Sequence, residues 1–401
     1  MVETVNLSYQ VYNKTTGASV FGPAEITSIF SGFGGLCETG SLSDPIILYD
    51  QAASRWVLGI VAFNSSFTSF DECMAVSTTS DATGSWYRYS FSFGSNLNDY
   101  DKLAVWSDGY YASYNIFQNG AFFIGPEVCS YNRTAMLAGN PATAVCFQRG
   151  TSDASFLPAN LDGSTQPATG EPDFYLELGN TTTSLNLFKF HVDFVNPTNS
   201  TFTGPTVITV PSYSLACGGG TCIPQKGTTQ QLDSLGDRLM HRLSYRNFGT
   251  YESLLATHSV KATKAPSGMR WYEIRSPNTT PVLYQRGTFS AGAISLWMGS
   301  IAQDKTGDIA LGFSASSSKL YPSIAYTGRV PTDTLGTMES PKLIISGTGA
   351  QTGGLSRWGD YSSMAIDPSD DCTFWYSQEY LKTTGSFNWD TRLASFKFPG
   401  C

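Results

Sequence analysis

Four stretches share one pattern: ILYDQAASRWVLGIVAF (47–63), AVWSDGYYASYNIF (104–117), SIAQDKTGDIALGFSAS (300–316) and MAIDPSDDCTFWYSQEY (364–380). Each begins with a short apolar run that an aspartate closes, and continues into a second run rich in β-branched and aromatic residues. The aspartates are Asp50, Asp108, Asp304 and Asp367. Such a unit cannot bury its own apolar face and needs neighbouring copies packed against it. The pattern therefore predicts the inner hairpins of a repeated all-β architecture.

A second element follows the first along the chain. QVYNKTTGASVFGPAEIT (10–27) and DFVNPTNSTFTGPTVIT (193–209) each combine a strand, a polar turn, an FGP or FTGP string and another strand. Looser versions occupy residues 75–91, 130–147, 270–289 and 325–345. These stretches are typical of the outer hairpin of a four-stranded antiparallel unit.

Alternation of the two elements predicts a β-propeller with four-stranded antiparallel blades. Six units are complete or nearly so, at 44–93, 100–148, 155–210, 232–290, 294–346 and 356–398. Residues 1–30 form a partial N-terminal blade, which favours seven blades, with six as the alternative. Because no linker-like break interrupts the repeat, we expect residues 1–401 to form a single propeller domain. The window 231–242 fits a helix weakly, and Gly236 interrupts it, so a loop followed by a strand fits as well.

Composition excludes several classes of protein. The net charge is -8 and the sequence pI is near 4.9, which argues against nucleic acid or an anionic membrane as a partner. The chain has no uninterrupted apolar stretch of about 20 residues, so we expect no membrane span. Charged residues make up only 14% of the chain and aromatic residues 13%, which suits short strands and tight turns.

The eight cysteines fall into four sequential pairs, and no C-x-x-C is present. With only three histidines as additional ligands, a zinc site is disfavoured, and we expect no metal and no cofactor. An even number without metal spacing favours four local disulfides over free thiols, although sequence alone allows 105 pairings. The expected pairs are Cys37–Cys73, Cys129–Cys146, Cys217–Cys222 and Cys372–Cys401.

N-x-S/T sequons are more frequent than the roughly four expected by chance from the Ser and Thr content. The seven asparagines are Asn6, Asn13, Asn64, Asn132, Asn180, Asn199 and Asn278. Most lie in turn-like stretches, where a glycan can project into water. Together with the cysteines they favour a secreted, extracellular glycoprotein. The N-terminus lacks the features of a signal peptide, so we interpret the sequence as a mature or truncated chain.

Several strings resemble secreted, sialidase-like β-propeller proteins of uncharacterised activity that occur in many bacteria. They are RWGDYSSMAIDPSDDCTFWYSQEY (357–380), LDSLGDRLMHRLSYRNFGTYESLLATHSV (232–260), GMRWYEIR (268–275), STTSDATGSWYRYSF (77–91) and DYDKLAVWSDGYY (99–111). The resemblance covers most of the chain and implies a sialidase-like propeller and export from the cell. It implies no established activity. It also implies a further strand before residues 1–13, so the first blade should lack its innermost strand.

A search for catalytic motifs gives little. TSDATGSW (79–86) resembles the Asp box of sialidases with Gly84 shifted by one position, but Asp boxes are structural turns. G-x-S-x-G, H-E-x-x-H and P-loop motifs are absent. The arginines that could bind a substrate carboxylate gather in one blade, unlike a sialidase triad: Arg238, Arg242, Arg246, Arg270 and Arg275. His191, His241 and His258 lie in apolar, strand-like stretches and are interpreted as core or rim residues.

Two groups of side chains allow two interpretations each. Asp360, Asp367, Asp370 and Asp371 could bind Ca²⁺, but they lack EF-hand spacing and fit better a turn in which they cap backbone N–H groups. Five tryptophans could form a sugar-stacking surface but fit better the core between blades. They are Trp271, Trp297, Trp358, Trp375 and Trp389.

Three functional hypotheses remain open. The sequence favours a non-catalytic extracellular scaffold, because it has sequons and cysteine pairs but no catalytic constellation. The alternatives are a glycan-directed hydrolase and a lectin-like carbohydrate binder. Acids that converge on a propeller channel from different blades would not form a linear motif. The candidates, each preceding an inner-strand run, are Asp44, Asp101, Asp237 and Asp360.

The ends of the chain raise the question of assembly. Residues 1–30 supply fewer strands than a blade needs, and the chain ends at Cys401, soon after a strand-like run. Either the two ends complete one composite blade, or a strand edge stays open. An open edge can pair with another copy of the chain and build a homo-oligomer or filament. Apart from carbohydrate and the chain itself, the sequence indicates no partner.

Overall fold

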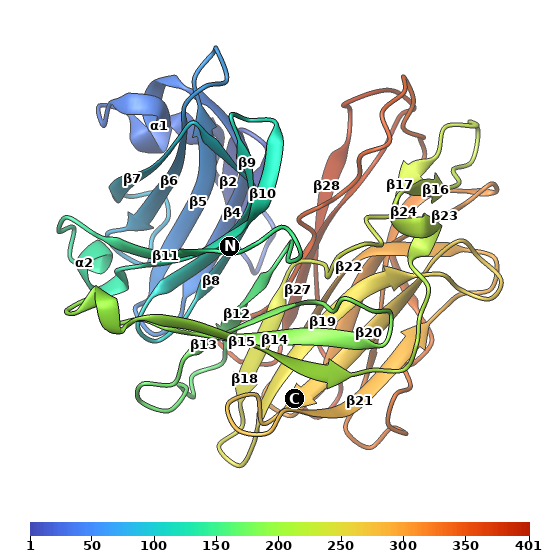
Figure 1. Cartoon of the computed structure of the whole chain (residues 1–401). Coiled ribbons are helices and arrows are strands. Elements are labelled where there is room, and N and C mark those ends of the chain that lie inside the picture. Colours follow the sequence, from blue (N-terminus) through green and yellow to red (C-terminus); the bar gives the residue numbers. More distant parts are fainter. The chain divides into compact units, whose positions relative to one another are not determined.

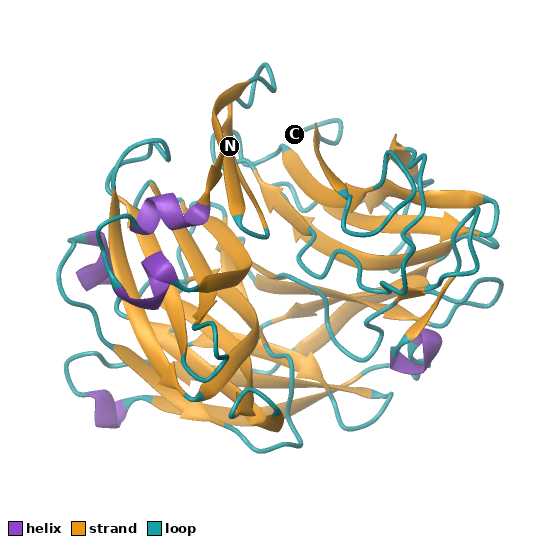
Figure 2. Cartoon of the chain, turned by 90° about the horizontal axis from the view of Figure 1, so that it is seen from above, coloured by secondary structure: helices purple, strands orange, loops and turns teal.

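The computed structural model describes residues 1–401 and is all-β, with 28 strands. Figure 2 shows that helix is confined to short segments in the connections. These are α1 (Gly35–Thr39), α2 (Arg133–Leu137) and the 3-10 segments Ile26–Phe30, Pro197–Asn199 and Ala216–Gly219. None of them is long and apolar enough to cross a membrane. The window 231–242 contains only the short strand β17 (Leu232–Asp233) and loop, so the helical interpretation of it is wrong.

The chain divides into two compact units. Unit 1 comprises residues 1–158 and 189–203, and unit 2 comprises residues 159–188 and 204–401. Within each unit, strands that follow one another in the sequence form sets. These sets can be followed in Figure 1 by the colours, which change along the sequence. A single propeller domain over the whole chain stays a prediction.

Unit 1 contains three sheets, each with its strands in chain order. The first is β1 (Val2–Val5), β2 (Ser8–Tyr12) and β3 (Ser19–Glu25). The second is β4 (Ser41–Asp50), β5 (Arg55–Phe63), β6 (Phe70–Ser77) and β7 (Trp86–Gly94). The third is β8 (Asn96–Val105), β9 (Tyr110–Gln118), β10 (Phe122–Tyr131) and β11 (Ala144–Gln148). All neighbouring strands in these sheets pair antiparallel.

An eight-stranded sheet, most of it in unit 2, joins two further sets of four. One set is β12 (Leu157–Asp162), β13 (Asp173–Leu178), β14 (Ser184–His191) and β15 (Thr201–Thr209). The other is β18 (Leu243–Asn247), β19 (Glu252–Val260), β20 (Gly268–Arg275) and β21 (Val282–Phe289). The first strands of the two sets, β12 and β18, pair in parallel from Ala159–Leu243 to Asp162–Arg246.

Unit 2 is completed by two more antiparallel sheets and a small ribbon. They are β22 (Ser295–Gln303), β23 (Ile309–Ser317), β24 (Leu320–Arg329) and β25 (Lys342–Ile345), then β26 (Ser363–Ile366), β27 (Phe374–Tyr380) and β28 (Asp390–Phe396). The ribbon pairs β16 (Thr221–Ile223) with β17. Seven sets of three or four consecutive strands thus follow the seven predicted blade ranges. A closed ring of seven blades stays a prediction.

Apolar faces hold neighbouring sheets together within each unit. In unit 2, Leu255 and Trp271 pack with Leu296 and Ile301 of the next sheet. In unit 1, the buried residues of the first two sheets form one cluster that includes Tyr9 and Ile60. Each such side chain contributes about 1.5–3 kcal/mol when it is fully buried. The repeated apolar runs in the sequence therefore supply the packing between sheets.

Three first strands carry a β-bulge with a residue in the left-handed region. The residues are Asp44 in β4, Tyr100 in β8 and Met298 in β22, with φ of 57°, 54° and 50°. The register shifts at the same places. A bulge bends its strand and changes the direction of the following side chains. The sequence did not predict these bulges. The bulge at Tyr100 affects the position of Asp101, the residue that follows it.

The FGP and FTGP strings mark equivalent positions in the outer strands β3 and β15. Gly22 and Gly204 both have positive φ, 88° and 131°. A Cβ at Gly22 would lie 2.7 Å from the Tyr9 carbonyl oxygen, and one at Gly204 would lie 2.9 Å from that of Leu187. Glycine is therefore required at both places by conformation and by space.

All eight cysteines are paired as the sequential disulfides Cys37–Cys73, Cys129–Cys146, Cys217–Cys222 and Cys372–Cys401. The strands near the two ends of the chain belong to different three-stranded sheets, β1–β3 and β26–β28. Completion of one composite blade by both ends stays a prediction, as does the alternative of an open strand edge. Pro23, which lacks an N–H, lies within the exposed edge strand β3 and weakens that edge as a template for strand addition.

Candidate active site

The four acids proposed from the sequence have different surroundings. Asp44 and Asp101 lie in unit 1, and Asp237 and Asp360 lie in unit 2. Asp44 accepts a hydrogen bond from the Ser43 hydroxyl at 2.8 Å, and Asp237 forms an exposed ion pair with Arg238 at 2.9 Å. Asp101 and Asp360 each lie close to a glutamate from another strand. Convergence of all four on one channel stays a prediction.

Asp360 and Glu379 form the carboxyl pair of unit 2. Asp360 precedes β26 and forms an ion pair with Arg357. Glu379 lies on β27, which pairs with β26 so that Ser363 is opposite Ser377. Glu379 lies two residues beyond this pair and accepts a hydrogen bond from the Gly359 N–H, which brings it near Asp360. The hairpin at Asp367–Thr373 thus places two carboxyl groups near each other although 19 positions separate them.

Glu379 is protonated at neutral pH. Burial raises its pKa to about 8, the Asp360 carboxylate adds to the rise, and the Gly359 N–H opposes it. The side chain is nevertheless only half-buried. A carboxyl with a raised pKa beside an ion-paired carboxylate is a combination that general acid catalysis by a carboxyl pair can use.

The segment before β26 is shaped to hold this pair. Gly359 has φ of 39°, and a Cβ there would collide with the Gln378 side chain. Gln378 is buried, donates from Nε2 to the Met298 carbonyl at 3.1 Å and accepts from the Glu379 N–H at 2.9 Å. These contacts fix the backbone of both carboxyl-bearing segments, which limits the freedom of the two side chains.

Glu72 and Asp101 form the corresponding pair of unit 1. Glu72 is 1% exposed and Asp101 is 2% exposed. Burial, and then the Asp101 carboxylate, raise the pKa of Glu72 well above its usual range. Asn98 donates to Glu72 Oε2 at 3.1 Å, and a Cβ at Gly59 would lie 2.9 Å from Oε1. This pair is enclosed by side chains and is part of the packing.

The repeated aspartates close turns. Asp50 accepts the Ala53 N–H at 3.0 Å, Asp304 the Thr306 N–H at 2.9 Å and Asp367 the Ser369 N–H at 2.9 Å. Asp108 instead accepts from the Tyr111 hydroxyl at 2.9 Å. The turn interpretation is therefore confirmed at three positions by backbone caps.

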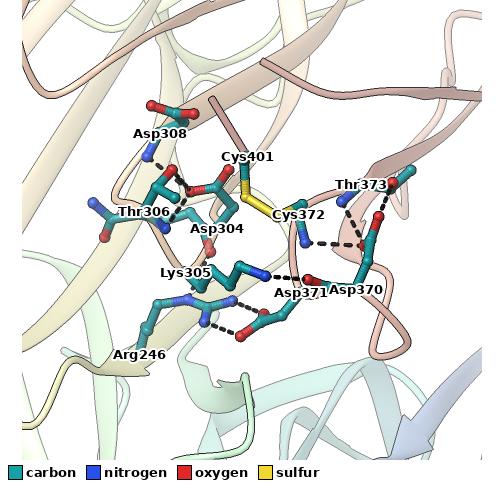
Figure 3. The surroundings of a disulfide bond; sticks show 11 residues. Arg246, Asp304, Lys305, Thr306, Asp308, Asp370, Asp371, Cys372, Thr373 and Cys401 are labelled. Atoms are coloured by element: carbon teal, nitrogen blue, oxygen red, sulfur yellow. Dashed lines mark hydrogen bonds and ion pairs between the residues drawn. A yellow bond between two sulfur atoms is a disulfide. The ribbon is translucent and has the colours of Figure 1, made fainter. Parts of the chain in front are cut away.

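The acidic group near the C-terminus also has structural tasks. Asp370 accepts the N–H groups of Cys372 and Thr373 at 3.0 and 2.9 Å. Figure 3 shows the Arg246 guanidinium facing both oxygens of Asp371, beside the Cys372–Cys401 disulfide. These caps and ion pairs support the turn interpretation over a calcium site. Elsewhere, Glu127 lies near Cys129 and Cys146, but the disulfide removes both sulfurs as metal ligands.

Four of the five arginines noted in the sequence are ion-paired. Arg238 pairs with Asp237, Arg242 with Asp162, Arg246 with Asp371, and Arg275 with Glu273. The Asp162 carboxylate also accepts from the Ser244 hydroxyl at 2.6 Å, so Arg242 belongs to a buried network. Arg270 takes part in no ion pair, and its guanidinium nitrogens Nε and Nη1 are buried without a hydrogen-bond partner.

Two of the three histidines and three of the five tryptophans noted in the sequence are buried. His258 is fully buried, contacts the Tyr272 hydroxyl at 3.0 Å, and has a pKa that burial lowers to about 3. His241 is buried and His191 is exposed. Trp271, Trp297 and Trp358 are buried, so a sugar-stacking surface of all five tryptophans is wrong. Trp375 and Trp389 are half-buried.

The sequons differ in exposure. Asn6, Asn13, Asn180 and Asn199 are exposed, whereas Asn64, Asn132 and Asn278 are half-buried. The Asn132 side chain caps α2 by accepting the Ala135 N–H at 3.0 Å. Glycosylation of these residues stays a prediction.

Comparison with known proteins gives only distant structural resemblances. No family model and no curated protein sequence matches the chain. A Hadza microbial sialidase, Hz136, has 9% identity and a TM-score of 0.41 over 98% of this chain, which spans 59% of that chain. The GH43 endo-arabinanase from Bacillus licheniformis has 10% identity and a TM-score of 0.37, covering 88% of this chain and 92% of that one. An α-L-arabinofuranosidase from Lactobacillus brevis has 11% identity and a TM-score of 0.34, covering 76% and 91%. These resemblances assign neither a family nor an activity to the chain.

Proposed function

We propose that the chain is a glycan-directed hydrolase in which Glu379 is the general acid and Asp360 its carboxylate partner. The observation that carries this proposal is the half-buried Glu379, whose pKa burial and Asp360 raise to about 8. A carboxyl group with such a pKa holds its proton at neutral pH and can donate it to a leaving group. The hydrolase alternative of the sequence analysis thus replaces the scaffold hypothesis as our main proposal.

The reaction needs only these two groups and water. Glu379 donates its proton to the glycosidic oxygen as the bond from that oxygen to the anomeric carbon breaks. Asp360 either removes a proton from the attacking water or attacks the anomeric carbon itself, after which water releases the sugar. In both cases water supplies the hydroxyl of the new hemiacetal and the proton that restores the acid.

The surface around Glu379 fits a sugar ligand. The buried side chains of β27, Phe374, Tyr376 and Gln378, alternate with the half-buried Trp375, Ser377 and Glu379. Because alternate residues of a strand share a face, Trp375 and Glu379 lie on the same face of the sheet. Ser377 lies between them on this face, and an indole ring on the same face as an acid suits the C–H face of a pyranose, which stacks on aromatic rings.

We propose that this activity lies outside the cell, which the cysteines and sequons support. Four disulfides persist only in an oxidising compartment, and all eight cysteines are paired. We therefore propose a secreted glycoprotein whose polysaccharide substrates are extracellular. We also propose that the seven strand sets are propeller blades, because first strands of successive sets lie side by side within each unit, as β4 with β8 and β22 with β26.

The experiment is a screen of the secreted protein against nitrophenyl glycosides and plant and animal polysaccharides. Asp360→Asn and Glu379→Gln should each lower hydrolysis by about 10²–10⁴-fold. Asp153→Asn is the matched control, since Asp153 lies in unit 1 and has an arginine partner of its own. Absence of hydrolysis across the panel, or equal activity in all three variants, would contradict the proposal.

A further inference from the structure

Arg270 lies in a polar cluster on one face of the sheet β18–β21. It is on β20 directly opposite His258 of β19, and the next residue on the same face of β20 is Tyr272. Tyr272 is in turn opposite Arg286 of β21. Tyr213, from the chain after β15, packs its ring edge-on against His258 at a centroid distance of 4.7 Å. All of these residues belong to unit 2.

The charges in this cluster are unbalanced. Burial lowers the pKa of Arg270, and the positive charge of Arg286 adds to this effect, whereas only the tyrosines Tyr272 and Tyr213 oppose it. No carboxylate acts on Arg270, whereas Arg242, Arg246 and Arg275 of the same sheet region each have an acid. Two guanidinium nitrogens buried without a partner cost free energy that an acceptor would recover.

His258 adds a third unsatisfied nitrogen. Its Nδ1 is buried and has no hydrogen-bond partner, while Nε2 contacts the Tyr272 hydroxyl at 3.0 Å. When the Tyr272 hydroxyl donates to Nε2, the neutral ring carries its proton on Nδ1 and can donate from there. The cluster then offers donors from Arg270 and His258 together with the positive charge of Arg286, and no competing anion.

We propose that this cluster binds the carboxylate of a small acid, with Arg270 as its principal ligand and Arg286 as a second positive charge. An arginine fork matches the two oxygens of a carboxylate and forms short, charge-assisted hydrogen bonds with it. The site is independent of the Asp360–Glu379 pair and of the hydrolase proposal. A carboxylate can belong to an acidic sugar or to a simple organic acid, and the experiment distinguishes the two.

The test is calorimetric titration of the whole protein with glucuronate, acetate, sulfate and neutral glucose. We expect glucuronate to bind and glucose at equal concentration to give no signal. Binding of acetate with similar affinity would assign the site to the carboxylate alone, and much weaker binding would assign it to an acidic sugar. Arg270→Met and Arg286→Gln should each weaken binding at least about tenfold, because each removes a charged contact.

Arg392→Gln is the matched control, since Arg392 is an exposed arginine on another sheet, in β28. Thermal unfolding of each variant without ligand shows whether it is folded. Arg270→Met should be at least as stable as the parent chain, because it removes a buried, unpaired charge. No binding of any carboxylate at millimolar concentration, or binding that Arg270→Met leaves unchanged, would overturn the proposal. Sulfate binding stronger than that of both carboxylates would overturn the assigned ligand.

Discussion

The carboxyl pairs of the two units have similar chemistry and differ in access. In unit 1, Glu72 and Asp101 are both almost fully buried, and Asn98 occupies one oxygen of Glu72. In unit 2, Glu379 is half-buried and its neighbour Asp360 pairs with the largely exposed Arg357. Burial and a nearby aspartate raise the pKa of the glutamate in both. A raised pKa alone therefore does not identify an active site. The two pairs differ in how deeply the glutamate residue is buried, since Glu72 is 1% exposed and Glu379 is half-buried.

The comparison predicts a large difference in stability when each glutamate is truncated. Glu72→Ala leaves a cavity and removes the acceptor of the buried Asn98 amide, so it should cost about 2–4 kcal/mol. Glu379→Ala should cost about 1 kcal/mol or less, because water can fill the half-exposed site. Urea unfolding measures both. Equal losses would show that the two pairs do not differ in access.

Replacement of Glu379 by glutamine tests its pKa through stability. Its folded pKa of about 8 lies above the unfolded value, so the folded state binds the extra proton between about pH 4.5 and pH 8. Stability from this group is therefore present at low pH and is lost as the pH rises through 8. Glu379→Gln should be more stable than the parent by about 1–2 kcal/mol at about pH 9 and equal to it at about pH 4. If the free energies of unfolding of the parent chain and Glu379→Gln differed by the same amount at every pH, this assignment would be contradicted.

A third carboxyl pair, Asp304 and Asp308, provides a purely structural reference. Figure 3 shows the backbone N–H groups of Asp308 and Thr306 donating to the Asp304 carboxylate. Burial, and then Asp304, raise the pKa of Asp308 to about 6. As with Glu379, the folded pKa of Asp308 lies above the unfolded value. Asp308→Asn should therefore stabilise the protein by up to about 1 kcal/mol at about pH 8 and not at about pH 4. Asp304→Asn, which weakens the turn caps, should destabilise it at both, and the reverse order would contradict the roles given to the two residues.

Chemical labelling sharpens the comparison without a change in stability. A water-soluble carbodiimide with an added amine couples carboxyl groups that it can reach and that carry a proton. Burial raises the pKa of both glutamates, and Glu379 is the less buried residue of the two, so we expect the reagent to couple to Glu379 and not to the enclosed Glu72. Peptide mass mapping should find the adduct on Glu379 and none on Glu72. Labelling of Glu72 alone would reverse the assignment.

Much of the fold follows from local sequence. The apolar runs predict the seven strand sets, since strands depend on alternation and β-branched or aromatic residues. Asp304 and Asp367 are followed two positions later by Thr306 and Ser369, whose N–H and hydroxyl groups both donate to the aspartate. Such contacts span few residues, which makes the turns predictable. The sequential disulfides likewise join nearby segments.

The candidate site was less predictable because it depends on register. The sequence singled out Asp360 and Asp101 but not Glu379 or Glu72, since neither glutamate lies in a motif. The hairpin register around Asp367–Thr373 is the signal that could have placed Glu379 near Asp360. The bulge at Tyr100, by contrast, depends on packing between strands and leaves no clear mark in composition. Distances between acids of different sheets therefore could not be obtained from the sequence.

The most direct test of the central claim is the pH dependence of kcat/KM for the best glycoside, measured for the parent chain and Glu379→Gln. The parent should lose activity as the pH rises through about 8, because Glu379 then gives up the proton that it must donate. Glu379→Gln should lose this alkaline limb and should be most impaired on substrates with poor leaving groups. An unchanged alkaline limb in Glu379→Gln, or full activity on all leaving groups, would contradict the assignment of Glu379 as the general acid.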